Sequence, residues 1–169
     1  ERIIISVAIS ISHPRRRTIN GYGMVSAPTL SAGGLTSMNE AVIAGLAAIE
    51  ERKQLYRQLG CSYYRPWMFL LTDGEPTDQN MEGEAKNRLQ QALNDKKVNF
   101  FPMGIGSGAN YAHLKSYTKG GNGAVLKASA SQFKEAFVWL SSSMSVISNS
   151  DPSLGNVTLE PTPMTIELI

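Results

Sequence analysis

Alternating apolar residues at the start of the chain predict a strand with one buried face. Large β-branched residues occupy every second position, and from Ser6 onward the positions between them are small or polar. The apolar positions are Ile3, Ile5, Val7, Ile9 and Ile11. Two later segments, Pro66–Thr72 and Lys97–Ile105, are instead almost continuously apolar. Such runs are typical of parallel strands that helices cover on both faces.

Apolar residues at helical spacing predict helices between these strands. The first helix follows Ser37–Glu40, which fits a capping box, and we expect it to end near Gly60. A second helix lies within Asn80–Lys96, and a short third helix begins near Asn110. The last helix opens at a second capping box, Ser129–Gln132. The first helix is expected to bury one face made by Val42, Leu46, Ile49, Tyr56 and Leu59.

The order of these elements predicts an α/β fold. We expect three layers, in which a mainly parallel, twisted sheet lies between helices on both of its faces. A short last strand is predicted at Ala124–Lys127, and Thr18–Leu30 has room for an irregular edge strand. Residues 1–150 would form this domain, and residues 151–169 a C-terminal extension with strand fragments at Val157–Leu159 and Thr165–Leu168.

Composition and charge agree with one globular domain and exclude several classes of protein. With 42% hydrophobic and 18% charged residues, the 169-residue chain is neither disordered nor collagen-like. A net charge of +2 is too small to indicate a nucleic acid or an anionic membrane as partner. The single cysteine, Cys61, cannot form an internal disulfide, which favours a reducing, cytoplasmic location. No segment approaches the roughly 20 apolar residues that span a bilayer.

Three acidic residues follow the buried strand Pro66–Thr72. Asp73 stands directly at the strand end, and Glu75 and Asp78 lie within the next five positions. Hard oxygen ligands grouped in this way suit Mg²⁺, Ca²⁺ or Mn²⁺ better than zinc, because no His or Cys is near. The alternative is that Asp73 caps a turn while the other two are solvated. This loop alone leaves both interpretations open.

A glycine-rich loop before the first helix offers a hydroxyl ligand. Because Ser37 is expected to cap the helix, the neighbouring Thr36 hydroxyl is free to point elsewhere. Gly33 and Gly34 would let this loop approach another loop across the sheet edge. The simpler interpretation is that Thr36 merely precedes a helix. In α/β sheets ligands bind beyond the carboxyl ends of the strands, where both loops are expected.

Taken together, these segments resemble the von Willebrand factor A domain family. Leu71–Asp78 matches that family's strand–aspartate–glycine–x–proline–threonine segment, and Gly33–Ser37 matches its glycine–x–threonine segment before a helix. Met103–Ala109 is similar to a later strand and turn of the family. The resemblance covers about Arg2 to Ile147 and is closest to the small intracellular bacterial branch associated with tellurium resistance and its phosphorylation systems.

The resemblance implies a non-enzymatic binding module with a metal-ion-dependent adhesion site. In such a site the protein holds a divalent ion, here Mg²⁺ or alternatively Mn²⁺ or Ca²⁺. A carboxylate of a protein partner completes the coordination shell of that ion. Carried over by position, Thr36 supplies the hydroxyl ligand and Asp73 the carboxylate ligand. The family's Asp-x-Ser-x-Ser ligand segment occurs nowhere in this chain. We therefore expect metal binding by this chain alone to be weak or absent.

The resemblance also carries an expectation about strand order. Because Glu1 opens directly into a strand-like run, we interpret it as the edge of a processed, trimmed or excised chain. The family's first strand would lie between the strand at Arg2–Ile11 and the strand at Pro66–Thr72. Its absence would expose two apolar edges. We therefore expect a preceding segment or another chain to fill this slot, rather than direct pairing of the two strands.

The alternative function is a nucleotide-binding α/β enzyme. Gly104, Gly106 and Gly108 follow a strand and precede a helix, as in a phosphate-binding turn. Their spacing is Gly-x-Gly-x-Gly rather than Gly-x-Gly-x-x-Gly, and the turn comes late in the chain. No nucleophile and base are paired in the sequence, and His113, in the first turn of a short helix, is expected to have a surface or packing role rather than to catalyse.

Overall fold

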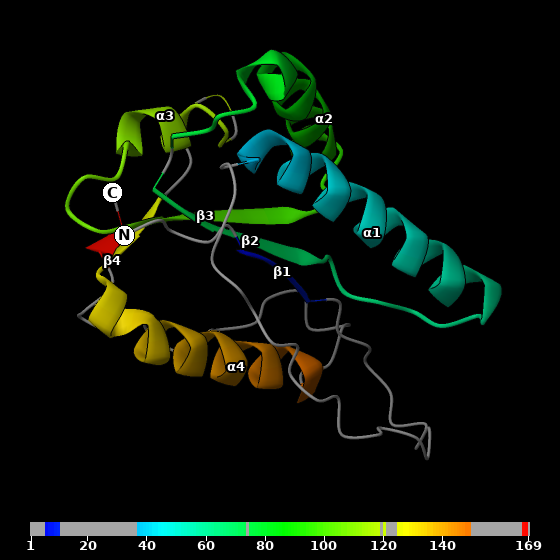
Figure 1. Ribbon diagram of the computed structural model, residues 1–169. Coiled ribbons are helices and arrows are strands. Elements are labelled where there is room, and N and C mark those ends of the chain that lie inside the picture. Colours follow the sequence, from blue (N-terminus) through cyan, green and yellow to red (C-terminus); the bar gives the residue numbers. More distant parts are fainter. Residues whose placement is uncertain are drawn as a thin grey trace.

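The computed structural model describes residues 6–10, 37–73, 75–118, 120, 125–149 and 167–168. Within these residues the chain forms a sheet with helices on both faces, as Figure 1 shows. The expected strands within Thr18–Leu30 and Val157–Leu159 lie outside the described residues. The α/β class predicted from the alternation of strands and helices is therefore confirmed.

The sheet has five described strands in the order β1-β2-β3-β4-β5. They are β1 (Ser6–Ser10), β2 (Trp67–Thr72), β3 (Asn99–Ile105), β4 (Leu126–Ala128) and β5 (Glu167–Leu168). β2, β3 and β4 run parallel, whereas β1 and β5 pair antiparallel to their neighbours at the two edges. The expectation of a mainly parallel sheet therefore holds for the central three strands only.

Direct pairing of β1 with β2 contradicts the expectation that a preceding segment or another chain fills a slot between them. Ser6 lies opposite Leu71, and Ser10 lies opposite Trp67, in an antiparallel register that extends along the whole of β1. The backbone edge of β2 that an additional strand would have used is thus already paired. This pairing provides hydrogen-bond partners for backbone N–H and C=O groups of β2 that would otherwise be unpaired at a sheet edge.

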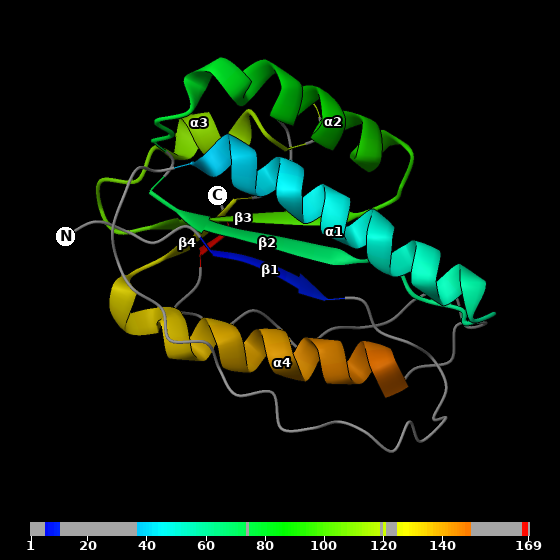
Figure 2. The ribbon, with the colours of Figure 1, turned by 45° about the vertical axis from the view of Figure 1, so that its right-hand side comes forward.

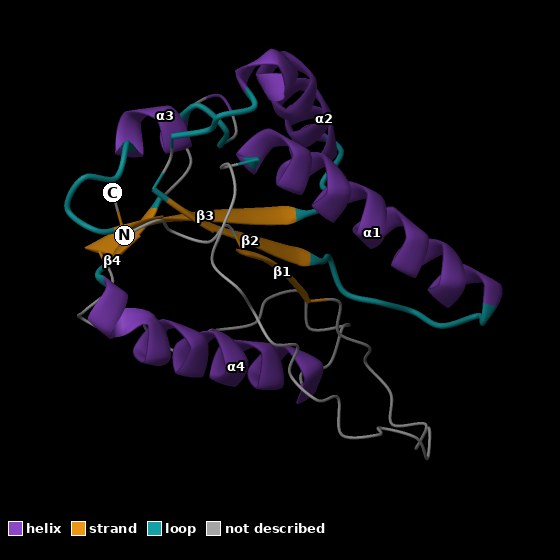
Figure 3. Ribbon diagram, viewed as in Figure 1, coloured by secondary structure: helices purple, strands orange, loops and turns teal. Residues whose placement is uncertain are grey.

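Helices cover both faces of the sheet, as predicted. One face carries α1 (Met38–Gln58), α2 (Glu82–Asn94) with a preceding 3₁₀ turn (Gln79–Met81), and the short α3 (Tyr111–Lys115). The other face carries α4 (Phe133–Asn149) with a preceding 3₁₀ turn (Ala130–Gln132). Figures 2 and 3 show the sheet lying between α4 and the other three helices.

β2 supplies the centre of two hydrophobic clusters, one on each face of the sheet. Its six residues are all buried, which confirms the interpretation of the apolar run as a doubly covered strand. Met68 and Leu70 point to the cluster shared with α1, α2 and α3. Trp67, Phe69 and Leu71 point to the other cluster, where Leu140 of α4 packs. The period of two along a strand explains this division.

α1 is longer than the core that it covers. Val42 and Ile49 are buried, whereas Leu55 and Leu59 are 42% and 63% exposed. Figure 1 shows that the second half of α1 extends past the end of the sheet. The predicted buried face is therefore correct for the first half of the helix and wrong at Leu59, because no sheet lies beneath that end.

The helix ends follow their sequence signals in part. Gly60 has a φ of +64°, and the amides of Gly60 and Cys61 donate to the carbonyls of Arg57 and Tyr56, which closes α1 as predicted. At the start of α4, the Ser129 amide donates to Gln132 Oε1 over 2.7 Å, one arm of the expected capping box. The Ser37 side chain, in contrast, makes no capping hydrogen bond, so that expected capping box is absent.

None of the helices in the described ranges combines the length and the apolar character that crossing a membrane requires.

Directly after α2, the non-glycine residue Lys96 adopts a left-handed backbone conformation. Lys96 has a φ of +54°, and the amides of Lys96 and Lys97 donate to the carbonyls of Leu93 and Ala92 in the same pattern that Gly60 makes in α1. A left-handed conformation costs a side-chain-bearing residue about 1 kcal/mol. We expect Lys96→Gly to raise the free energy of unfolding by about 1 kcal/mol, measured by urea denaturation.

Gly60→Ala is the matched control for this prediction, because it introduces the same strain in α1 and should lower stability by a similar amount. A Lys96→Gly variant that is no more stable than the parent would contradict the assignment.

Candidate functional site

Two loops and the start of a helix meet at the carboxyl ends of β2 and β3. The backbone carbonyl of Asp73, directly after β2, accepts a hydrogen bond of 2.8 Å from the amide of Asn110, which precedes α3. Further along the same loop, Asp78 contacts the first turn of α1. The candidate site is therefore formed by the loop after β2, the loop after β3 and the start of α1, as the topology of a parallel sheet favours.

Asp73 presents one engaged and one unengaged carboxylate oxygen. Its Oδ1 accepts a hydrogen bond from the Glu75 amide over 3.2 Å and lies 3.4 Å from the Thr72 hydroxyl. Within the part of the chain that the structure describes, its Oδ2 makes no hydrogen bond. Asp73 thus both orders its own turn and keeps an oxygen available to a ligand.

Thr36, the other predicted ligand, lies outside the described residues. Ser37 immediately follows it and is the first described residue of that segment, at the start of α1. The distance between the Thr36 and Asp73 side chains therefore stays a prediction. The neighbouring α1 turn does contact the Asp73 loop, through Asp78.

Asp78 stabilises the start of α1. Its Oδ2 accepts a hydrogen bond of 2.8 Å from the amide of Glu40, in the third position of the helix. Its Oδ1 and its backbone carbonyl accept hydrogen bonds from the Asn39 amide group over 3.1 and 3.0 Å. A carboxylate here satisfies an unpaired helix amide and interacts favourably with the helix dipole. Asp78 therefore performs the capping that the sequence assigned to Ser37.

The three acids of this loop do not form a carboxylate cluster. The Asp78 carboxylate accepts a hydrogen bond from the first turn of α1, and Glu75 is exposed to solvent. Among the described residues, no group of three or more His, Cys, Asp or Glu side chains is arranged to hold a metal ion. The possibility that Asp73, Glu75 and Asp78 bind a cation together is therefore not supported by their positions.

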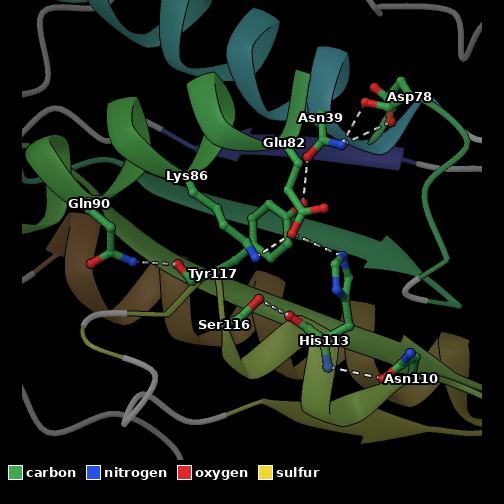
Figure 4. A network of polar contacts seen from close by, with 9 residues as sticks. All are labelled: Asn39, Asp78, Glu82, Lys86, Gln90, Asn110, His113, Ser116 and Tyr117. Carbon is green, nitrogen blue, oxygen red and sulfur yellow. Dashed lines mark hydrogen bonds and ion pairs between the residues drawn. The ribbon is translucent and has the colours of Figure 1, made fainter. Parts of the chain in front are cut away.

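A buried polar pair beside the site was not found from the sequence. Asn39 and Tyr117 are both fully buried, and the Tyr117 hydroxyl donates a hydrogen bond of 2.5 Å to Asn39 Oδ1 (Figure 4). The pair connects the first turn of α1 to the segment after α3. Buried polar groups without partners are costly, so this bond links the two segments strongly. Asn39 lies close to the predicted start of the first helix, and the local sequence does not indicate that its side chain is buried.

Charged groups surround the Tyr117 ring, as Figure 4 shows. Lys86 forms an ion pair with Glu82, and its ammonium lies 4.8 Å from the centre of the ring. The His113 ring packs edge-on at 5.3 Å, with its Nε2 4.0 Å from the Glu82 carboxylate. Burial, followed by the charges of Glu82 and Asp78, raises the pKa of the Tyr117 phenol. The hydrogen bond from Lys86 lowers the pKa of Glu82.

Contacts within the protein explain two glycines of the turn after β3. A Cβ at Gly104 would collide with the Tyr111 ring, and the Tyr111 hydroxyl donates to the Gly106 carbonyl over 3.0 Å. The Gly106 amide donates to the Ala128 carbonyl, and Gly106 has a φ of +88°. Close packing of Tyr111 and a left-handed turn thus account for Gly104 and Gly106 without a bound phosphate.

Comparison of the chain with protein families, with curated proteins and with solved structures found no match in any of the three.

The Asn39–Tyr117 bond can be measured by a double-mutant cycle. We expect Asn39→Ala and Tyr117→Phe each to lower the free energy of unfolding by about 1–3 kcal/mol, because each leaves a buried polar partner unsatisfied. The double variant should lose less than the sum, with a coupling of about 1 kcal/mol or more in urea denaturation. Asn94→Ala, at an exposed position of α2, is the control and should change little. Additive losses would contradict a direct bond.

The raised pKa of Tyr117 predicts a loss of stability at alkaline pH. The phenol has an ordinary pKa of 10.0, and the folded protein keeps its proton above that value while the unfolded chain loses it. The free energy of unfolding should therefore fall as pH rises above about 10, by up to about 1.4 kcal/mol per pH unit from this group. Tyr117→Phe should remove this part of the slope. Parallel pH profiles of the parent and the variant would contradict the assignment.

Proposed function

We propose that this chain is a non-enzymatic binding module that recognises a carboxylate of a protein partner through a divalent cation. Thr36 and Asp73 would be the protein's ligands for that cation, with Mg²⁺ the expected ion and Mn²⁺ or Ca²⁺ as substitutes. The proposal follows the resemblance of Gly33–Ser37 and Leu71–Asp78 to the ligand loops of von Willebrand factor A domains.

The observation that carries the proposal is the contact between the Asp73 loop and the first turn of α1. Asp78 accepts hydrogen bonds from Asn39 and Glu40, and these contacts join the Asp73 loop to the α1 turn that directly follows Thr36. The free Oδ2 of Asp73, within the described residues, supports a role as ligand. Residues 38 and 39 positions apart in the sequence are thereby brought into contact.

The chemistry of the two ligands suits a hard cation. Mg²⁺ takes oxygen ligands in octahedral geometry and keeps several waters, so a site with few protein ligands leaves positions for a visiting carboxylate. Two protein ligands hold an ion only weakly, and we expect dissociation constants on the order of 10⁻³ M. The proposed cytoplasmic location follows from the single cysteine and the family resemblance. The proposed role in a bacterial stress or tellurium-resistance system follows from the resemblance alone.

The contacts of the described residues do not favour the nucleotide-binding alternative. The amides of Gly106 and Asn110 donate to the carbonyls of Ala128 and Asp73, so they are not directed at a phosphate. The short α3 gives the turn only five helical residues, and the spacing of the glycines differs from that of dinucleotide-binding turns.

Titration with Mn²⁺, followed by its electron paramagnetic resonance signal, tests the proposed site. We expect weak binding to the parent that Mg²⁺ displaces, and at least tenfold weaker binding to Asp73→Asn and to Thr36→Val, since each loses one ligand at nearly constant volume. Asp95→Asn is the control, because Asp95 pairs with Lys97 beyond α2 and should bind Mn²⁺ as the parent does.

Equal Mn²⁺ binding by the parent and Asp73→Asn would exclude Asp73 as a ligand. Tight binding of ATP without metal, in a separate calorimetric titration, would favour the nucleotide-binding alternative.

A further inference from the structure

A cavity of about 200 Å³ lies between α1 and α2, on the face of the sheet where Figure 2 shows these helices side by side. Its apolar wall is formed by Leu46, Ile49, Ala92 and Val98. Its polar wall includes Lys53, Glu50, Arg88 and Lys97. Pockets for drug-sized ligands are usually larger, about 300–1,000 Å³, so an occupant of this cavity must be small.

Lys53 is the unusual member of this wall. Its side chain is only 5% exposed, although lysines are almost never buried unless their charge is paired. Its ammonium donates to Glu50 Oε1 and to the Lys97 carbonyl, each over 2.9 Å. An ammonium has three N–H donors, so among the described residues one donor has no acceptor. A buried donor without an acceptor is costly unless a ligand or water satisfies it.

The charges around Lys53 favour an anion. Arg88 and Lys97 add two cations to the wall, and Glu50 is the one carboxylate among the described residues that line it. The Arg88 and Lys97 side chains are about half exposed, and they pair with Glu84 and Asp95, respectively, outside the cavity. Glu50 already pairs with the Lys53 ammonium, so it repels each negative charge of a ligand bound there. A ligand with two negative charges therefore meets more repulsion than a ligand with one. These charges suit a monoanion better than a dianion such as a phosphate monoester.

We propose that this cavity binds a small carboxylic acid with a short apolar tail. The carboxylate accepts the remaining N–H of Lys53, and the tail packs against Leu46, Ile49, Ala92 and Val98. This site lies between α1 and α2 and uses none of the ligands of the proposed cation site, so either proposal can fail alone.

Titration of the ¹⁵N-labelled protein with four probes tests this site by amide chemical shifts. The probes are hexanoate, acetate, hexan-1-ol and hexylammonium, which separate the anionic head from the apolar tail. We expect hexanoate to shift the amides of Ala92 and Val98 and to bind at least tenfold more tightly than each other probe. Equal binding of hexanol or hexylammonium would overturn the proposal, as would the absence of hexanoate binding.

Variants locate the site. Lys53→Met keeps the straight side chain and removes the ammonium, and it should weaken hexanoate binding at least tenfold. Ala92→Phe should abolish binding by filling the cavity. Lys134→Met, at an exposed position of α4, is the control for loss of one positive charge and should bind as the parent does. Unchanged binding in Lys53→Met would overturn the proposal, and if that variant fails to fold, the probe series on the parent decides.

Discussion

The carboxylate of Asp78 and the amide of Asn39 hold together segments that the sequence keeps far apart. Asp78 bonds both to the Asn39 side chain and to the Glu40 amide, and Asn39 in turn accepts the hydroxyl of buried Tyr117. The loop after β2, the start of α1 and the segment after α3 are thereby fixed to one another. Asn39 and Tyr117 are fully buried and Asp78 is half-buried, so the loss of any of these three side chains leaves a polar partner without compensation. The position of the loop after β2 relative to the start of α1 depends on this connection.

The sheet provides the rigid base for these loops. β2 is buried on both faces and lies at the centre of two apolar clusters, so the residue that follows it, Asp73, leaves the sheet from a fixed point. The Asn110 amide then holds the Asp73 carbonyl, which ties the loop after β3 to the same edge. A carboxylate held by rigid strands and a satisfied turn is suited to recognition, because little freedom is lost when it binds a ligand.

The same face of the sheet carries two different polar environments. At the carboxyl end of β2, the Asp73 oxygen that makes no hydrogen bond among the described residues suits a hard cation. Between α1 and α2, buried Lys53 and its apolar neighbours suit a small anion. The packing of α1 against α2 creates the second environment. The meeting of α1 with the loop after β2 creates the first, so α1 contributes to both.

Local patterns in the sequence determined the elements, because period, caps and turns depend on neighbouring residues. The doubly buried β2, the close of α1 at Gly60 and the layered α/β class were all predicted on that basis. Three features were decided by tertiary structure. β1 pairs directly with β2, since strand order depends on which edges meet. Asp78 replaces Ser37 as the cap of α1, since its bond to Glu40 spans 38 positions. Asn39, Tyr117 and Lys53 are buried by helix packing, which no local pattern records.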